Sequence, residues 1–225
     1  MQWINLGLIF VAGLNVGLAL LIWMLNPKNK INITFALSIF FLAVWALGIA
    51  MFREAQQEKI ALMWTWVQNG SGSLIVIPFF LFSLYFPYQD KVLKKWQIFL
   101  IIMSIVAILA VVVASNAWVK EIRLDPPNND YNINFWGVLY FNIHFYFYLI
   151  LAFYNLFNKY KKSQGFMKTQ LLYVILATGI IASFGGIFGA IIPLFLLRSA
   201  GPYYLGPYFS LPFVILTVRF IYRKD

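Results

Sequence analysis

Residue types that carry much of protein chemistry are scarce in this sequence. Its 225 residues include no cysteine, one histidine and seven acidic residues, and charged residues make up only 11% of the chain. The lack of cysteine excludes disulfides, thiolate metal ligands and palmitoylation. A single histidine, with the acids confined to the edges of apolar stretches, leaves serine, thiol and metal catalysis without the partner groups they need. We therefore expect no catalytic residue, no metal site and no cofactor.

Hydrophobic residues, in contrast, make up 62% of the chain and aromatic residues 20%. An ordinary soluble domain has roughly 45–50% apolar residues, and a soluble fold of this size could not bury the excess. Disordered chains are poor in the same residues. The composition thus indicates a membrane protein whose main partner is the lipid bilayer.

Seven apolar stretches are long enough to cross a bilayer as helices, which takes about 20 residues each. The predicted spans cover residues 3–25, 31–52, 60–87, 96–119, 135–158, 169–197 and 203–222. The alternation typical of barrel strands is absent. The predicted fold class is an all-α membrane protein, with residues 1–225 forming one seven-transmembrane helix bundle.

The net charge of +10 is distributed unevenly between the predicted loops. The segments after the first, third and fifth spans, together with the C-terminal end from Arg219, carry 12 of the 17 Lys and Arg residues and two acids, whereas the opposite side carries five of each sign. Because Lys and Arg accumulate on the cytoplasmic side, we expect the N-terminus outside and the C-terminus in the cytoplasm. This orientation requires an odd number of spans. It also explains the positive net charge by membrane topology, so we do not expect the nucleic-acid partner that the same charge would suggest for a soluble protein.

The fifth span contains the one ionisable side chain expected near the bilayer interior, His144. Tyr140, His144 and Tyr148 follow one another at four-residue intervals, so they share one helix face. An ionisable group in the membrane is a candidate functional residue, and we predict a ligand pocket lined by this face and by Ser71 and Ser73 of the third span. The alternative is a neutral histidine that hydrogen-bonds between helices and serves packing.

Small residues recur at helix-packing spacing in two spans. They are Gly13 and Gly17 in the first span, and Ala182, Gly185, Gly186 and Gly189 in the sixth. Such residues let helices approach closely, here either inside the bundle or in a homodimer.

The predicted outer loop from Lys120 to Asn134 is longer than the other connections. It contains Asp125-Pro126-Pro127-Asn128-Asn129-Asp130, a composition typical of turns. Two interpretations stay open, a solvated connector and a lid over a pocket that faces outward.

Several functions associated with seven helices lack their required residues. No carboxylate is expected inside the membrane, where a proton relay would need one. The span 203–222 has no lysine for a retinal Schiff base before Val218, and no segment looks like an ion-selectivity filter.

Three short motifs occur in a characteristic order along the chain. They are Asn26-Pro27-Lys28-Asn29-Lys30 before a second span that contains Trp45, Leu205-Gly206-Pro207 at the start of the seventh span, and Arg219-Phe220-Ile221-Tyr222-Arg223 at its end. With the seven spans, they make the whole chain resemble the N-terminal seven-transmembrane sensor region of bacterial histidine kinases. The resemblance implies that the protein is located in a bacterial cytoplasmic membrane and that its partner is a histidine kinase or another cytoplasmic output protein. It also implies that the signal leaves through the end of the seventh span, at Arg219 and Arg223.

Members of that family continue into a phospho-accepting domain and an ATP-binding domain, whereas this sequence ends three residues after Tyr222. His144 is predicted to lie in the membrane, out of reach of cytoplasmic ATP. We therefore expect no enzyme activity here, with any kinase activity in a fused or partner domain.

Two functions of different class follow from the sequence. The first is a sensory module that detects an extracellular or membrane-borne ligand and passes a conformational signal through the seventh span. The alternative is a small-solute transporter or a structural subunit of a membrane complex, although no internal repeat typical of transporters is evident.

Overall fold

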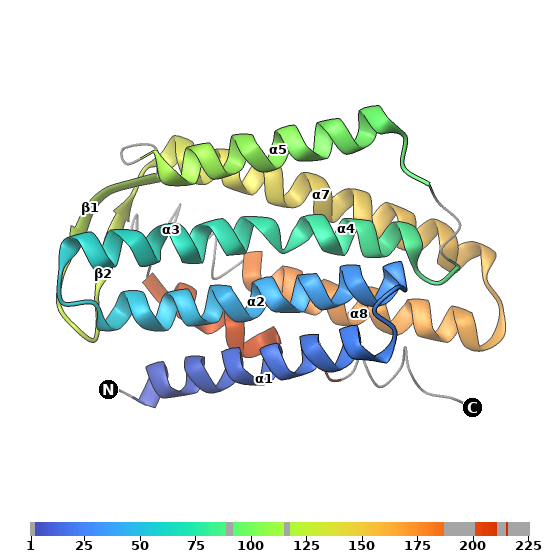
Figure 1. Ribbon diagram of the computed structural model, residues 1–225, viewed down its shortest axis with the longest axis horizontal. Helices are drawn as coiled ribbons and strands as arrows, with labels where there is room; N and C mark the ends of the chain where they lie inside the picture. Colours follow the sequence, from blue (N-terminus) through green and yellow to red (C-terminus); the bar gives the residue numbers. More distant parts are fainter. Residues whose placement is uncertain (1–2, 89–91, 115–117, 187–200, 211–214, 216–225) are drawn as a thin grey trace.

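The chain forms a bundle of long helices in a computed structural model that describes residues 3–88, 92–114, 118–186, 201–210 and 215 (Figure 1). Six helices or helix pairs in the described part are long and apolar enough to cross a membrane. They are α1 (Trp3–Leu25), α2 (Lys30–Glu54), α3 with α4 (Glu58–Leu74 and Val76–Tyr85), α5 (Lys95–Val113), α7 (Phe135–Lys162) and α8 (Gly165–Gly186). The predicted all-α membrane fold class is confirmed.

The seventh predicted span begins as a 3₁₀ helix, η2 (Gly201–Phe209). Residues 187–197 of the sixth predicted span and most of the seventh after Ser210 lie outside the described residues. The η2 segment packs against α1, α2 and α8, so the start of the seventh span lies inside the bundle.

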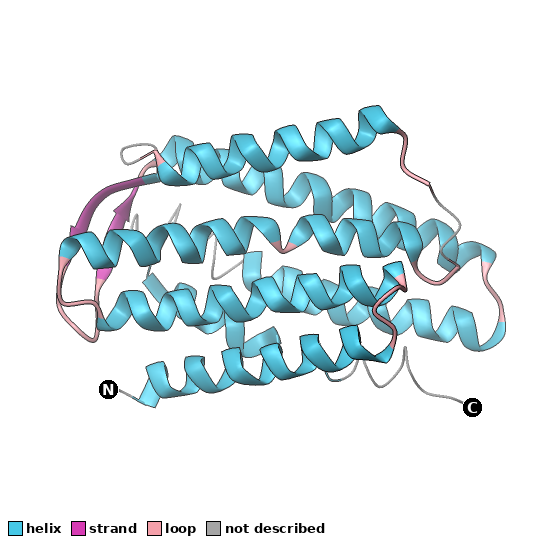
Figure 2. Ribbon diagram, viewed as in Figure 1, coloured by secondary structure: helices cyan, strands magenta, loops and turns pink. Residues whose placement is uncertain are grey.

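The third span is interrupted at Ile75, between α3 and α4, which continue one another in line (Figure 2). Pro78 lies just after this point and has no N–H to donate to the carbonyl four residues earlier, at Leu74. The fourth span is shorter than predicted. The prediction ended it at residue 119, but α5 ends at Val113, and Val119 begins a β-strand.

The long loop after α5 folds into a β-hairpin, drawn in magenta in Figure 2. Strand β1 (Val119–Arg123) pairs antiparallel with β2 (Asp130–Ile133), with Arg123 opposite Asp130 and a bulge between Val119 and Glu121. The hairpin lies at the end of the bundle where α1 begins and α2 ends (Figure 1). Most of the first half of this loop is exposed, as a solvated connector would be, but the side chains of Asn129 and Tyr131 are buried, so the loop also packs on the bundle.

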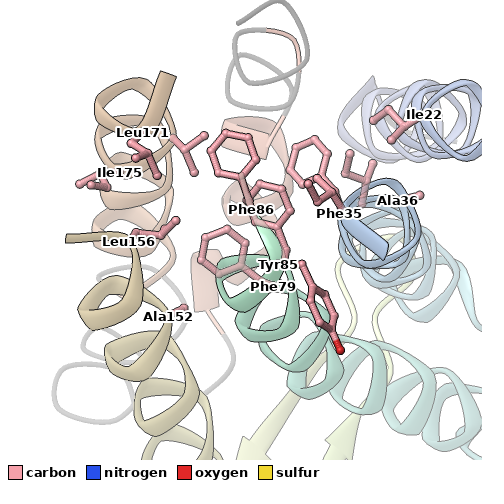
Figure 3. Close-up of a cluster of buried hydrophobic side chains, with 14 of the residues drawn as sticks. Ile22, Phe35, Ala36, Phe79, Tyr85, Phe86, Ala152, Leu156, Leu171 and Ile175 are labelled. Atoms are coloured by element: carbon pink, nitrogen blue, oxygen red, sulfur yellow. The ribbon is translucent and has the colours of Figure 1, made fainter. Parts of the chain in front are cut away.

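The main core lies toward the other end of the bundle and is rich in aromatic rings (Figure 3). It includes Ile22 of α1, Phe35 and Ala36 of α2, Phe79 and Tyr85 of α4, Phe86, Ala152 and Leu156 of α7, and Leu171 and Ile175 of α8. Lipid is as apolar as these side chains, so close packing rather than escape from water holds the helices together. Helix α5 buries only Ile108 and Val112 and forms the edge of the bundle.

Candidate functional site

The structure separates the three residues of the predicted fifth-span stripe. His144 and Tyr148 are buried in α7, whereas Tyr140 is 39% exposed. Only His144 and Tyr148 therefore face the bundle interior.

His144 lies among rings and hydroxyl groups where α7 meets α3, α4 and α5. Its ring centroid is 5.2 Å from that of Tyr148, and the Ser73 backbone lies beside the imidazole. The Tyr148 hydroxyl is 2.6 Å from the Ser104 hydroxyl of α5, and its ring packs on Phe80 of α4. Within the described part of the chain, the Nε2 atom of His144 is buried without a hydrogen-bond partner.

The hydroxyl groups of Ser71 and Ser73 are used within their own helix. Ser71 donates to the Val67 carbonyl at 2.7 Å, and Ser73 donates to the Gly70 carbonyl at the same distance. Both serines are buried, but neither donates its hydroxyl proton across to another helix. Ser73 contributes its backbone to the surroundings of His144, and a ligand role for either hydroxyl stays a proposal.

The small residues predicted for helix packing have different environments. Gly13 and Gly17 lie on the exposed face of α1, with no described atom near the position of an added Cβ. Ala182 packs against the main core from α8. Gly185 and Gly186 end α8, and Gly189, Arg219 and Arg223 lie outside the described residues.

A close glycine-mediated approach between α2 and α3 occurs at Gly48. A Cβ there would lie 2.9 Å from the Gln68 Cβ and 3.0 Å from the Gln68 backbone, so α2 and α3 nearly touch. Gly206 of η2 is covered by the Trp45 indole, which would lie 2.6 Å from an added Cβ. Two of the motifs that carry the sequence resemblance, Trp45 and Leu205-Gly206-Pro207, thus meet in space.

A polar network centred on Arg53 occupies the hairpin end of the bundle. Arg53 is in the last turn of α2 and is only 5% exposed. Its Nε donates to Asn5 Oδ1 of α1 at 2.8 Å, and its Nη2 donates to Asn128 Oδ1 of the hairpin turn at 3.2 Å. The guanidinium also lies 4.7 Å from the ring centroid of Tyr204 in η2. One side chain therefore joins α1, α2, the hairpin and the start of the seventh span; we call Asn5, Arg53, Asn128 and Tyr204 the Arg53 network.

Among the described residues, the partners of the Arg53 guanidinium are all neutral. Glu54 is next in sequence, but its carboxylate accepts a hydrogen bond of 2.6 Å from Asn5 Nδ2, so the amide of Asn5 stands between the two charges. A buried charge without an opposite charge is costly in a low-dielectric environment. Hydrogen bonds and the aromatic face offset part of that cost.

Two buried residues fix the hairpin over this network. Asn129 Nδ2 donates to the carbonyls of Phe52 at 2.9 Å and Ala55 at 2.7 Å. The Tyr131 hydroxyl accepts from Gln68 Nε2 at 3.3 Å and Asn69 Nδ2 at 3.4 Å. Burial raises the pKa of Tyr131 above its ordinary value, although the hydrogen bonds from Asn69 act in the opposite direction. The hairpin is therefore a docked element of the bundle.

The sequence analysis counted Arg53 only as one of the five basic residues on the side opposite the Lys- and Arg-rich loops, and it missed this network. The available signal was polar residues inside or beside the apolar stretches, such as Asn5, Asn15 and Gln68. A polar side chain in a membrane helix usually faces a partner in the bundle. The identity of that partner depends on contacts between residues far apart in the chain.

A family model described as the N-terminal 7TM region of histidine kinase matches residues 7–221. The comparisons with curated proteins and with solved structures gave no match. The matched segment includes α2 with Arg53, the hairpin and η2.

Proposed function

The chain belongs to the family of N-terminal 7TM regions of histidine kinases, and from this premise we propose that it detects a ligand at the hairpin end of the bundle and signals to a cytoplasmic histidine kinase. The family describes a multi-pass membrane sensor region. The ligand-binding end, the direction of the signal and the route through the seventh span are our proposals.

The observation that carries the proposal is the contact of Arg53 with Tyr204. The excess of Lys and Arg in the other loops supports an orientation with the N-terminus and the hairpin outside. The Arg53 network then connects the outer hairpin to the first residues of the span that leads inward. A ligand that binds one arrangement of this network more tightly than another would shift the bundle toward it.

Trp45 and Gly206 support the same route. The indole fills the space above Gly206, so a displacement of η2 toward α2 requires Trp45 to move. We propose that the change continues along the seventh span to Arg219 and Arg223. His144 and Tyr148 lie along the bundle interior and provide a second, deeper position where a membrane-borne ligand could act. The exposed α1 face with Gly13 and Gly17 is available for a second copy of the chain.

The test joins this region to a histidine kinase core and measures kinase phosphorylation in bacterial membranes. We expect Arg53→Gln to change the phosphorylation level several-fold, because it removes the group that joins the hairpin to η2. Arg123→Gln, at an exposed position of β1, is the matched control and should leave phosphorylation unchanged. Equal phosphorylation in all three proteins, at equal amounts in the membrane, would refute the proposed route.

A further inference from the structure

The acids in the described part of the chain form no ion pair with Arg53. Of the seven, Glu54, Glu121 and Asp130 accept hydrogen bonds from Asn5, Asn132 and the Tyr131 backbone. Glu58 and Asp125 also lie in the described part of the chain, where Arg53 forms no ion pair and has Asn5 and Asn128 as its hydrogen-bond acceptors. Asp90 and Asp225 lie outside the described residues.

The guanidinium keeps part of its hydrogen-bonding capacity free. It has five N–H groups, and within the described residues it uses Nε for Asn5 and Nη2 for Asn128. Nη1 has no partner among the described residues. The Nη1 edge therefore keeps its N–H donors for a small acceptor, and the neighbouring Asn128 is exposed.

The surroundings of this edge determine how a ligand would approach. Tyr204 covers one face of the guanidinium, so an acceptor must come in the guanidinium plane. Asn128 lies at that side and is itself exposed in the hairpin turn. Its Oδ1 accepts from Arg53, which leaves its Nδ2 as a second donor beside the guanidinium.

We propose that Arg53 and Asn128 form a binding site for an oxyanion, a carboxylate or phosphate group, that supplies the missing negative charge. This inference rests on the proposed function and names the chemical class of its ligand. An oxyanion accepts two parallel hydrogen bonds from a guanidinium, and such charge-assisted bonds are stronger than those between neutral groups. A neutral ligand would leave the buried charge uncompensated, and a cationic ligand would be repelled.

The oxyanion has two possible sources, a soluble ligand and the headgroup of an anionic lipid. Trp3 and Trp136 are strongly exposed at the starts of α1 and α7, at the hairpin end. Exposed tryptophans of this kind lie at the level of lipid headgroups. Arg53, at the end of α2, is therefore at a depth that both sources can reach.

The test uses the purified full chain in phosphatidylcholine nanodiscs, without a kinase. Thermal unfolding is followed while sodium phosphate or sodium acetate is added at constant ionic strength, with acetamide as the neutral counterpart of acetate. In a separate series, phosphatidylglycerol replaces part of the phosphatidylcholine. We expect at least one of these anions to raise Tm of the unmodified protein, and acetamide to have no effect.

Variants test whether the anion-induced increase in Tm arises from binding at Arg53 and Asn128. Arg53→Gln should abolish it and Arg123→Gln should preserve it. Asn128→Ala changes an exposed turn residue and should raise the apparent Kd at least several-fold, and Arg53→Lys should weaken binding while keeping the charge. A response to phosphate or acetate identifies a soluble source, and a response to phosphatidylglycerol alone identifies a lipid source.

Two results would refute the proposed oxyanion site. One is an equal increase in Tm in Arg53→Gln and the unmodified protein, and the other is no increase in Tm with any of the three anions. If Arg53→Gln does not fold, an apparent Kd unchanged in both Asn128→Ala and Arg53→Lys overturns it equally. Because the assay contains no kinase, its failure is separate from failure of the signalling route. If anion binding depends on Arg53 but Arg53→Gln leaves kinase phosphorylation unchanged, the oxyanion site is supported and the proposed signalling route is refuted.

Discussion

The side-chain amide of Asn15 donates a hydrogen bond of 3.0 Å to the hydroxyl of Ser210, 195 positions later in the sequence. Asn15 lies near the middle of α1 and is completely buried. Ser210 directly follows η2, and its own hydroxyl donates to the Pro207 carbonyl at 2.6 Å. The first span thus holds the start of the seventh span through a polar contact deep in the bundle.

Substitution of Asn15 and substitution of Ser210 should lower the free energy of unfolding by different amounts. Asn15→Leu should cost about 0.6 kcal/mol, a typical value for a hydrogen bond between membrane helices, because Ser210 still has the Pro207 carbonyl. Ser210→Ala should cost more, about 1–3 kcal/mol, because it leaves the buried Asn15 amide without a partner. Unfolding in mixed micelles of increasing denaturing detergent measures both. The double variant should be more stable than the sum of the two losses predicts, and strict additivity would show that the contact contributes nothing.

The close approach of α2 and α3 predicts a steric effect at Gly48. An alanine there would place its Cβ 3.0 Å from the Gln68 backbone, which cannot rotate away. We expect Gly48→Ala to lower the free energy of unfolding by about 1–3 kcal/mol, as other overpacked sites do. Gly17→Ala is the control, because no described atom lies near its added Cβ. By helix propensity it should be neutral or stabilising by up to about 1 kcal/mol. Equal losses in both variants would contradict the packing described here.

The buried hydroxyl of Tyr131 predicts a stability change in alkaline solution. Its pKa is raised by burial, so the folded protein holds the phenolic proton more tightly than the unfolded chain does. The resulting stabilisation is complete below the ordinary tyrosine pKa of about 10 and is lost as the pH rises through the raised value. Tyr131→Phe should therefore reduce the fall in unfolding free energy above about pH 10. Tyr88→Phe, at an exposed position, is the control; identical pH profiles for unmodified protein and Tyr131→Phe would reject the prediction.

The helices were largely predictable because each depends on local composition. Asn29 caps α2 by accepting from the Ile31 backbone N–H, and the span predicted from residue 31 begins one residue away, at Lys30. The end of the fourth span was not predictable from hydropathy. Residues 114–119 are still apolar enough for a helix, but Val119 instead pairs with Ile133 of β2.

The candidate site was only partly predictable, and helix geometry explains the error at Tyr140. Four residues advance an α-helix by about 40° more than one turn, so a stripe with this spacing rotates around the helix axis. Tyr148 and His144 face the interior, whereas Tyr140 has rotated to the exposed side. The Arg53 network joins residues from four elements, and no local pattern shows that Asn5, Asn128 and Tyr204 surround the same guanidinium.

Lys159 provides a last prediction, at the end of the bundle remote from the hairpin. Its Nζ donates to the main-chain carbonyls of Ser83 at 2.9 Å and Leu84 at 2.7 Å, and also to that of Phe86. These carbonyls are at the C-terminal end of α4, where a positive charge is favourable to the helix dipole. The ammonium group therefore holds α7 to the end of α4.

Lys159→Met should remove this connection while keeping a side chain of similar length. We expect a loss of about 2 kcal/mol in unfolding free energy, since hydrogen bonds to charged groups contribute roughly that much each and the freed carbonyls can regain some partners from water. Lys161→Met removes the same charge at an exposed position and should cost little. Hydrogen exchange adds a local readout, in which the amides at the end of α4 should exchange faster in Lys159→Met alone. If both variants unfold and exchange like the unmodified protein, Lys159 does not hold these two helices together.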